Sequence, residues 1–186
     1  MPYPSIASVI LAVLLAGVAA FVDGRTGVVP NWLTLPVLGV APLLHAWAGR
    51  GLRPPIAMSG ALFAALVSLF SAALCGLVPF LLFRLRLAGG GDAKLLAALG
   101  ALLLPNTGLF VELLAFAFAA FFVPARLAYH GRLIATLGKT LVTAANPVLP
   151  VDRRHALPWE MAERLRLGPF ILLGTLTAPF FLRHLS

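Results

Sequence analysis

Long apolar segments follow one another along the chain, separated by short stretches of polar, basic or turn-forming residues. A helix needs about 20 apolar residues to cross a bilayer, and several of the segments approach or reach that length. The pattern therefore predicts an all-α, polytopic membrane protein with about six transmembrane helices. The segments cover residues 5–22, 32–48, 56–83, 93–104, 109–123 and 168–185.

The fourth and fifth segments are the hardest to separate. Residues 93–104 would extend only about 18 Å as a helix, which is short of a hydrocarbon core of about 30 Å. One long helix over 93–123 is the alternative. We favour two helices because Pro105-Asn106-Thr107-Gly108 is typical of a turn. The stretch before Ala93 can then enter the membrane if protein surrounds it.

Composition supports the membrane interpretation. Hydrophobic residues make up 61% of the 186 residues and charged residues 11%, which leaves no stretch long enough for a separate soluble domain. We therefore expect residues 1–186 to form a single integral-membrane domain, with 6–22 retained as its first span because the basic flank of a signal peptide is missing. The net charge is +8, and the basic residues stand between the apolar segments. At such positions anionic lipid headgroups are favoured over nucleic acid as a partner.

The positions of Lys and Arg predict the topology. With six spans, eleven of the fourteen fall in the first, third and fifth loops, and only Arg50, Arg53 and Arg183 fall on the other side. The positive-inside rule then places those three loops in the cytoplasm and both termini outside.

The fifth loop, 124–167, mixes apolar and basic residues, so we expect it to lie at the cytoplasmic membrane interface. Its last part has the features of a short surface helix, with Pro158 in the first turn, Arg164 and Arg166 near the end and Gly168-Pro169 as the stop. A simple connector with basic topology signals is the alternative.

Two of the six acidic residues lie at predicted ends of spans. Asp23 ends the first span, and Asp92 follows three glycines, Gly89 to Gly91. The six-span topology brings both to the same side of the membrane, although 69 positions separate them. An ionisable group at such a boundary is a functional candidate. The alternative is that each merely marks a membrane boundary beside a cation, Arg25 or Lys94.

Two carboxyl groups close together in a partly dry site do not easily both ionise, so one keeps a proton while the other stays charged. This is the acid and base pair that an aspartic peptidase uses to activate water and to protonate a peptide carbonyl. Glycines before Asp92 would allow a substrate strand to approach the backbone closely.

Other catalytic motifs are missing from the sequence. It contains no HExxH and no GxSxG motif, and its four histidines have no ligand spacing, so no metal or cofactor is expected. The single cysteine, Cys75, excludes an intrachain disulfide and a four-cysteine zinc site. We expect His45 and Trp47 to anchor the second span at the headgroups, and Glu112 to reach the outer interface or to pair structurally.

The motifs D-x-R-x-x-x-V-P-N at 23–31 and G-x-G-D-x-K-L at 89–95 resemble those of the type IV prepilin peptidase family. Gly168-Pro169-Phe170 is a weaker match to a stretch found late in that family. The resemblance implies a bacterial inner-membrane aspartic peptidase of the GxGD kind, which removes the short basic leader of prepilin or pseudopilin substrates on the cytoplasmic side.

The resemblance also implies roles for individual residues. Asp23 and Asp92 match the two catalytic aspartates, and Gly89 and Gly91 match the glycines of the GxGD loop. Four further residues match accompanying motif positions that shape the site or meet the leader, namely Arg25, Pro30, Asn31 and Lys94.

The chain departs from larger family members, which resemble it but add a cytoplasmic domain with two CxxC pairs and methylate the new pilin N-terminus. Only Cys75 is present here, so the chain is similar to the short, peptidase-only form that serves tight-adherence (Flp) pili, and no methyltransferase activity is expected. Two other interpretations remain open. In the first, the carboxylates pair with Arg25 and Lys94 in a small transporter or assembly subunit. In the second, the chain is a presenilin-like peptidase that cuts within the bilayer. We rank the second lower, because no tyrosine precedes Asp23 and both aspartates lie at helix ends.

Overall fold

Helices form wherever the sequence has long apolar runs, and the prediction of an all-α protein is confirmed. A computed structural model of the chain describes residues 4–51, 59–85, 88–129, 131 and 167–185. Hydroxyl groups begin two of the helices, since Ser5 Oγ accepts from the Ser8 N–H and Ser59 Oγ from the Leu62 N–H. The elements are α1 (Ile6–Thr26), α2 (Asn31–Ala48), the short 3₁₀ turn η1 (Gly49–Gly51), α3 (Gly60–Arg84), α4 (Gly90–Tyr129) and α6 (Gly168–Leu185).

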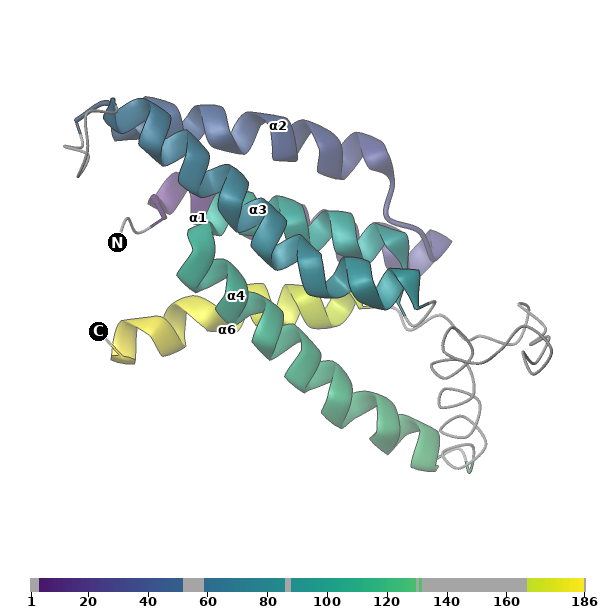
Figure 1. Cartoon of the computed structure of the whole chain (residues 1–186). Coiled ribbons are helices and arrows are strands. Elements are labelled where there is room, and N and C mark those ends of the chain that lie inside the picture. Colours follow the sequence, from purple (N-terminus) through teal and green to yellow (C-terminus); the bar gives the residue numbers. More distant parts are fainter. Residues whose placement is uncertain (1–3, 52–58, 86–87, 130, 132–166, 186) are drawn as a thin grey trace, which may run out of the picture.

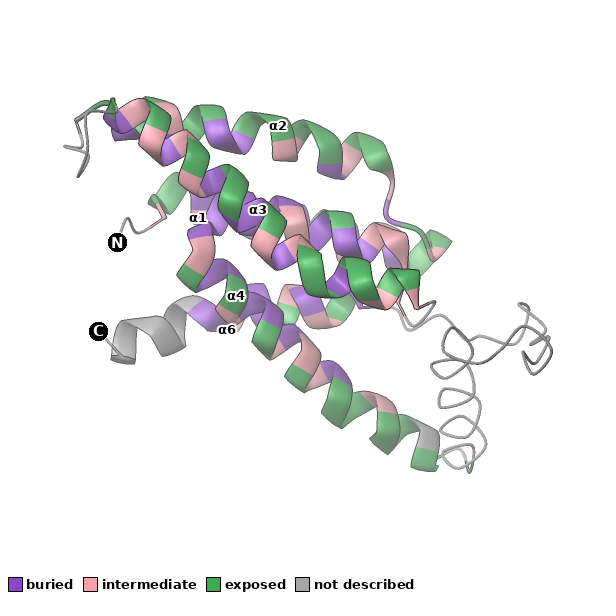
Figure 2. Cartoon of the chain, in the orientation of Figure 1, coloured by how far each residue is buried: buried purple, intermediate pink, exposed green. Residues whose placement is uncertain are grey.

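Three stretches of the described chain are long and apolar enough to cross a membrane: α1, α3 and residues 90–126 within α4. Their outward faces carry large apolar side chains, among them Leu14 and Phe70, while small residues such as Ala16 point inward. Figure 2 shows such an exposed outer face along α3, and a similar one along α2. Exposed apolar surface of this extent fits contact with lipid.

Helix α4 consists of two helices joined at a single residue. Leu104 has a φ of 64° and a ψ of 169°, which are not helical values, so residues 90–103 form a first half and 105–129 a second half. Figure 1 shows the second half returning toward the end of the bundle where α4 begins. The predicted interruption is present, but the predicted four-residue turn is wrong: Pro105 to Gly108 already form the first helical turn of the second half, because proline suits that position.

The carbonyl groups at this break receive hydrogen bonds from other helices. Pro105 has no N–H to offer Ala101, and the backbone of Leu104 interrupts the helical ladder beyond it. Such unpaired groups are costly in a membrane interior. Side chains of α2 and α3 donate to three consecutive carbonyls: Ser71 Oγ to Gly100 (2.7 Å), Ser68 Oγ to Ala101 (2.8 Å) and His45 Nε2 to Leu102 (3.0 Å).

His45 therefore does not anchor the chain at the headgroups, and that prediction is wrong. Its ring is only 6% exposed, and the Nε2–H tautomer is needed for its bond to Leu102. Trp47, two residues later, is exposed and lies under the guanidinium of Arg50 at 4.0 Å from its ring centroid. The sequence places a histidine and a tryptophan two positions apart, but only packing against α4 decides which of the two side chains faces inward.

The first half of α4 is the central element of the bundle. From Leu95 to Leu103 its residues are buried or half-buried on every side, unlike those of the other helices, and a helix that is apolar all round is one that protein encloses. Helices α1, α2, α3 and α6 all contact α4. Enclosure by protein explains how so short a helix can be accommodated. The buried side chains are Ala93, Leu95, Leu96, Ala98, Leu99, Ala101, Leu102 and Leu103.

Five helix ends meet at one end of the bundle. Figure 1 shows that α1 and α3 end there and that α2, α4 and α6 begin there, while the N and C ends of the chain lie at the opposite end. Both aspartate motifs are on these helix ends. Residues 132–166, which include most of the predicted interfacial loop and its short surface helix, lie outside the described residues.

Candidate active site

Asp23 occupies the last turn of α1 and faces the interior of the bundle. Inward residues of α1 recur at helical spacing, and Ala12, Ala16, Ala19 and Asp23 form one buried stripe, with Asp23 only 4% exposed. The helix continues beyond the predicted end at residue 22 and stops at Gly27, whose φ of 69° suits glycine. Asp23 is thus held by a regular helix rather than by a loop.

Asp92 is the third residue of α4 and is 5% exposed. The backbone N–H of Gly89 donates a hydrogen bond to its carboxylate, and the Asp92 N–H donates to the Gly89 carbonyl at 3.2 Å. This is the way in which an acidic residue at the third helical position caps a helix start. The amino end of a helix also favours a carboxylate. The local fold therefore fixes the side chain of Asp92.

The structure brings the two carboxyl groups together, close enough to interact electrostatically. Close contact between the two motifs makes this possible. A Cβ on Gly91 would lie 2.9 Å from Val29 Cβ and 3.1 Å from the Val29 N, so only glycine allows α4 to approach the α1–α2 connection in this way. The glycine before Asp92 thus acts by admitting the neighbouring backbone.

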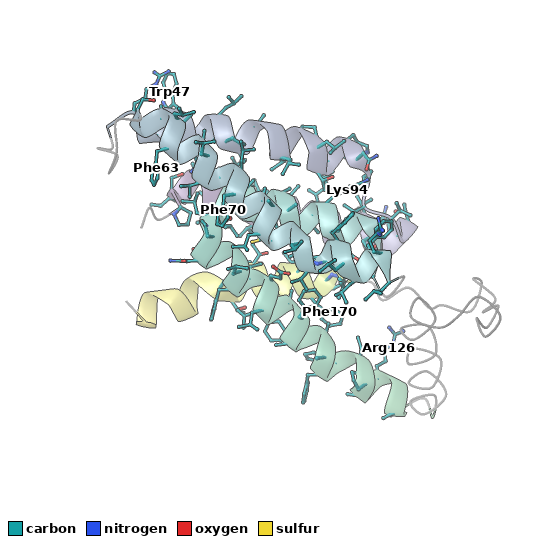
Figure 3. The ribbon with its side chains drawn as sticks, in the orientation of Figure 1. Trp47, Phe63, Phe70, Lys94, Arg126 and Phe170 are labelled. Atoms are coloured by element: carbon teal, nitrogen blue, oxygen red, sulfur yellow. The ribbon has the colours of Figure 1, made fainter. Side chains whose placement is uncertain are left out.

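A hydrogen bond also joins the two motifs. Lys94 Nζ donates to Asn31 Oδ1 at 2.7 Å, which ties the first turn of α4 to the first residue of α2. Figure 3 shows Lys94 at the end of the bundle where α2 begins, with Trp47 at the other end. Pro30 precedes Asn31 as the N-cap, with a φ of −74° that proline prefers. Lys94 and Asn31, one from each motif, are therefore in direct contact.

Arg25 takes a different position from its motif neighbours. Its guanidinium lies 4.2 Å from the ring centroid of Phe21, and both side chains are exposed. Such a cation–π pair is typical of an exposed helix end. The contact that the structure gives for Arg25 is therefore with the outer surface of α1 rather than with the Asp92 motif.

Gly168 is a site residue whose role sequence reasoning missed, although the Gly168-Pro169-Phe170 stretch stands out in the sequence. A Cβ at Gly168 would lie 2.9 Å from Asp23 Oδ2 and 3.1 Å from Asp23 Cβ. Helix α6 begins at this residue, so its amino end rests directly on the Asp23 side chain. The unpaired N–H groups and partial positive charge of a helix start suit a neighbouring carboxyl group.

Glu112 is not at the outer interface, contrary to the prediction. It lies in the second half of α4 and is 5% exposed. The prediction was wrong because helix length along the chain says nothing about which neighbours cover a side chain. Within the described ranges, no group of three or more His, Cys, Asp or Glu could hold a metal ion.

Two enclosed carboxyl groups at one end of the helix bundle form the candidate site, and the long apolar helices indicate a membrane protein. Comparison with known families identifies the family to which the chain belongs. The family model described as the type IV leader peptidase family matches residues 9–124, well over half of the chain. The chain belongs to the type IV leader peptidase family, and the resemblance seen in its motifs is confirmed. No curated protein and no solved structure matches the chain.

Proposed function

We propose that the protein is an aspartic endopeptidase that removes the short leader of type IV prepilin-like substrates, with Asp23 and Asp92 as its catalytic pair. One observation carries the proposal: two carboxyl groups 69 positions apart are both buried and close enough to interact at the same end of an apolar bundle. Membership of the leader peptidase family supports a prepilin-type substrate.

The proposed mechanism uses both carboxyl groups. The ionised one takes a proton from a water molecule as its oxygen attacks the peptide carbonyl, and the protonated one donates to the carbonyl oxygen. Collapse of the tetrahedral intermediate re-forms the C=O bond and breaks the C–N bond. The proton held by the first carboxyl passes to the departing amine, and the second carboxyl takes a proton back from the hydroxyl group that becomes the carbonyl. The Gly89 N–H and the start of α6 would keep the two side chains in place through this cycle.

Substrate recognition would occur partly in the bilayer. The leader is basic and eleven Lys and Arg lie in the loops on the proposed catalytic side, so bulk charge attraction does not explain binding. We propose that the apolar segment of the pilin docks against the helices while the leader reaches Asp23 and Asp92. Equal cleavage of a leader peptide that lacks its apolar segment would contradict this proposal.

The proposed arrangement in the membrane has six spans in a single domain, 1–186. The spans would be α1, α2, α3, the two halves of α4 and α6, with both termini outside and the aspartates on the cytoplasmic side of the inner membrane. Residues 124–167 would form the basic interfacial loop. Proteins of the short, tight-adherence type are the proposed relatives, and we propose that no methyl transfer from S-adenosylmethionine to the cleaved pilin occurs.

The test is a gel-shift assay with a prepilin from the same genome, co-expressed with wild-type protein, Asp23→Asn or Asp92→Asn. Asp152→Asn is the matched control, because Asp152 is the third aspartate of the chain and lies outside both motifs. We expect wild type and Asp152→Asn to process the pilin and the other two variants to fail, at equal membrane levels. Normal processing by both motif variants would exclude the pair.

The same assay separates the peptidase from a transporter or assembly subunit. If the carboxyl groups only hold helices together or relay protons, the Asn variants should lower the amount of folded protein or stop flux. Loss of cleavage with unchanged membrane levels and unchanged melting temperature would instead support catalysis.

A further inference from the structure

Glu112 is a buried acidic residue that the proposed mechanism does not use. It lies in the second half of α4, eight residues beyond the break at Leu104, and only 5% of its surface is exposed. Within the described part of the chain, neither of its carboxyl oxygens has a hydrogen-bond partner. An acidic side chain in this state inside a membrane bundle calls for a specific explanation.

Close packing on two sides encloses this part of α4. One turn before Glu112, a Cβ on Gly108 would lie 2.9 Å from Cys75 Sγ and 3.1 Å from the Gly100 Cα. On the α6 side, a Cβ on Gly174 would lie 2.7 Å from the Val111 carbonyl oxygen and 3.1 Å from the Ala115 N. Backbones therefore approach closely just before and just after Glu112, and there is little freedom for the turn that carries it to move outward.

Among the side chains that the structure describes, none next to Glu112 offers a compensating positive charge. From α3, the titratable group that interacts with it is the thiol of Cys75, and the described side chains of α6 include no acidic or basic residue. Lys and Arg side chains in the described ranges are all exposed and lie near helix ends, at Arg25, Arg50, Arg84, Lys94 and Arg126.

A carboxylate ion in this position would be a buried charge without a counter-ion among the described residues, which costs several kcal/mol even after the protein relaxes. A bound metal cation would need several further oxygen ligands, and the described residues do not supply such a cluster. A neutral carboxylic acid avoids both costs and leaves only the smaller penalty of an unpaired polar group.

We propose that Glu112 is a proton-binding site inside the bundle, separate from Asp23 and Asp92, and that its bound proton allows the second half of α4 to pack against α3 and α6. The proposal rests on burial, packing and the missing counter-charge, and it does not depend on the proposed peptidase activity.

Infrared difference spectroscopy of the protein in lipid vesicles tests the proposal directly. The spectrum of wild type minus Glu112→Gln should contain the C=O band of a protonated carboxylic acid, shifted on transfer to D₂O. The Asp23 and Asp92 groups are common to both samples and cancel. Carboxylate bands in place of the acid band would overturn the proposal.

Stability measurements provide an independent test. Glutamine has the shape of the neutral acid, so Glu112→Gln should melt within about 4 °C of wild type. Glu112→Lys should melt at a far lower temperature, because it places an ammonium group at a buried position where a neutral group stood. Leu113→Lys, at the next and exposed position, controls for a lysine in this turn. If Glu112→Gln loses as much stability as Glu112→Lys, the residue is ionised and paired, and the proposal is wrong.

Prepilin cleavage supplies the last readout. Glu112→Gln should process a prepilin as wild type does, because the neutral side chain keeps the packing of α4. If wild type cleaves and Glu112→Gln does not, the side chain has a role that a neutral acid cannot explain. If neither protein cleaves, the failure concerns the proposed function, while the infrared and melting results still decide the state of Glu112.

Discussion

Lys94 and Asn31, 63 positions apart, are joined by a hydrogen bond of 2.7 Å between the ammonium group and the side-chain oxygen. The bond links the helix start that carries Asp92 to the helix that follows the Asp23 motif. Both side chains are exposed, so its contribution is expected to be modest, about 1 kcal/mol. Its importance would lie in fixing the relative position of two catalytic groups.

We therefore predict that Lys94→Met and Asn31→Leu each reduce the rate of prepilin cleavage by about 5-fold to 10-fold, because each removes the same bond. The double variant should be little worse than either single variant. A double-mutant cycle on initial cleavage rates measures the coupling. Fully additive effects would show that the two residues act separately.

Gly168→Ala should reduce cleavage on the order of 100-fold, since its Cβ would lie 2.9 Å from Asp23 Oδ2 and displace either the carboxyl group or α6. The matched control is Gly17→Ala, where a Cβ meets no atom within 4 Å. Initial rates and membrane levels of both variants check the prediction. Similar rates for the two variants would contradict a close contact of α6 with Asp23.

Gly91→Ala should likewise lower cleavage strongly, because the added Cβ would come within 2.9 Å of Val29 and push the start of α4 away from the α1–α2 connection. Gly24→Ala is the control inside the other motif, since a Cβ there meets nothing within 4 Å. The comparison uses kcat and KM for a prepilin in detergent. We expect the loss mainly in kcat, because a displaced Asp92 affects the chemical step more than binding.

The hydroxyl groups at the break in α4 should contribute to stability. Ser68→Ala and Ser71→Ala each leave a buried carbonyl without its donor, so each should cost about 0.5–1.5 kcal/mol. Thermal unfolding in lipid or detergent measures the effect. Thr177→Ala is the control, because its hydroxyl bonds to Leu173 within its own helix. Equal melting temperatures for all three variants would show that the break is not held by these side chains.

Much of the fold was predictable because the determinants are local. Apolar length identifies the helices, and the inward stripe of small residues in α1 leads at helical spacing to Asp23. The glycines before Asp92 also indicate a close approach to the backbone in advance, although Val29, the residue that Gly91 admits, is far away in the sequence. These features depend on spacing within one segment, which a single sequence contains.

The less predictable features depend on contacts between segments. Pro105 indicates a break in α4, yet the residue that takes the non-helical conformation is Leu104, and the groups that cap its carbonyls come from α2 and α3. His45 and Glu112 are polar residues in apolar runs, and a membrane-boundary position was the simpler expectation for both. Their burial is decided by the enclosing helices, which no local pattern specifies.

The first half of α4 carries a consequence for how the protein is made. At roughly 21 Å it is too short to cross a bilayer alone, and other helices cover it on every side from Leu95 to Leu103. We therefore do not expect the insertion machinery to release this segment into lipid by itself. We expect it to enter together with the second half of α4 and to pack against α1 to α3, which precede it in the chain, so a chain that stops before α4 holds no assembled carboxyl pair.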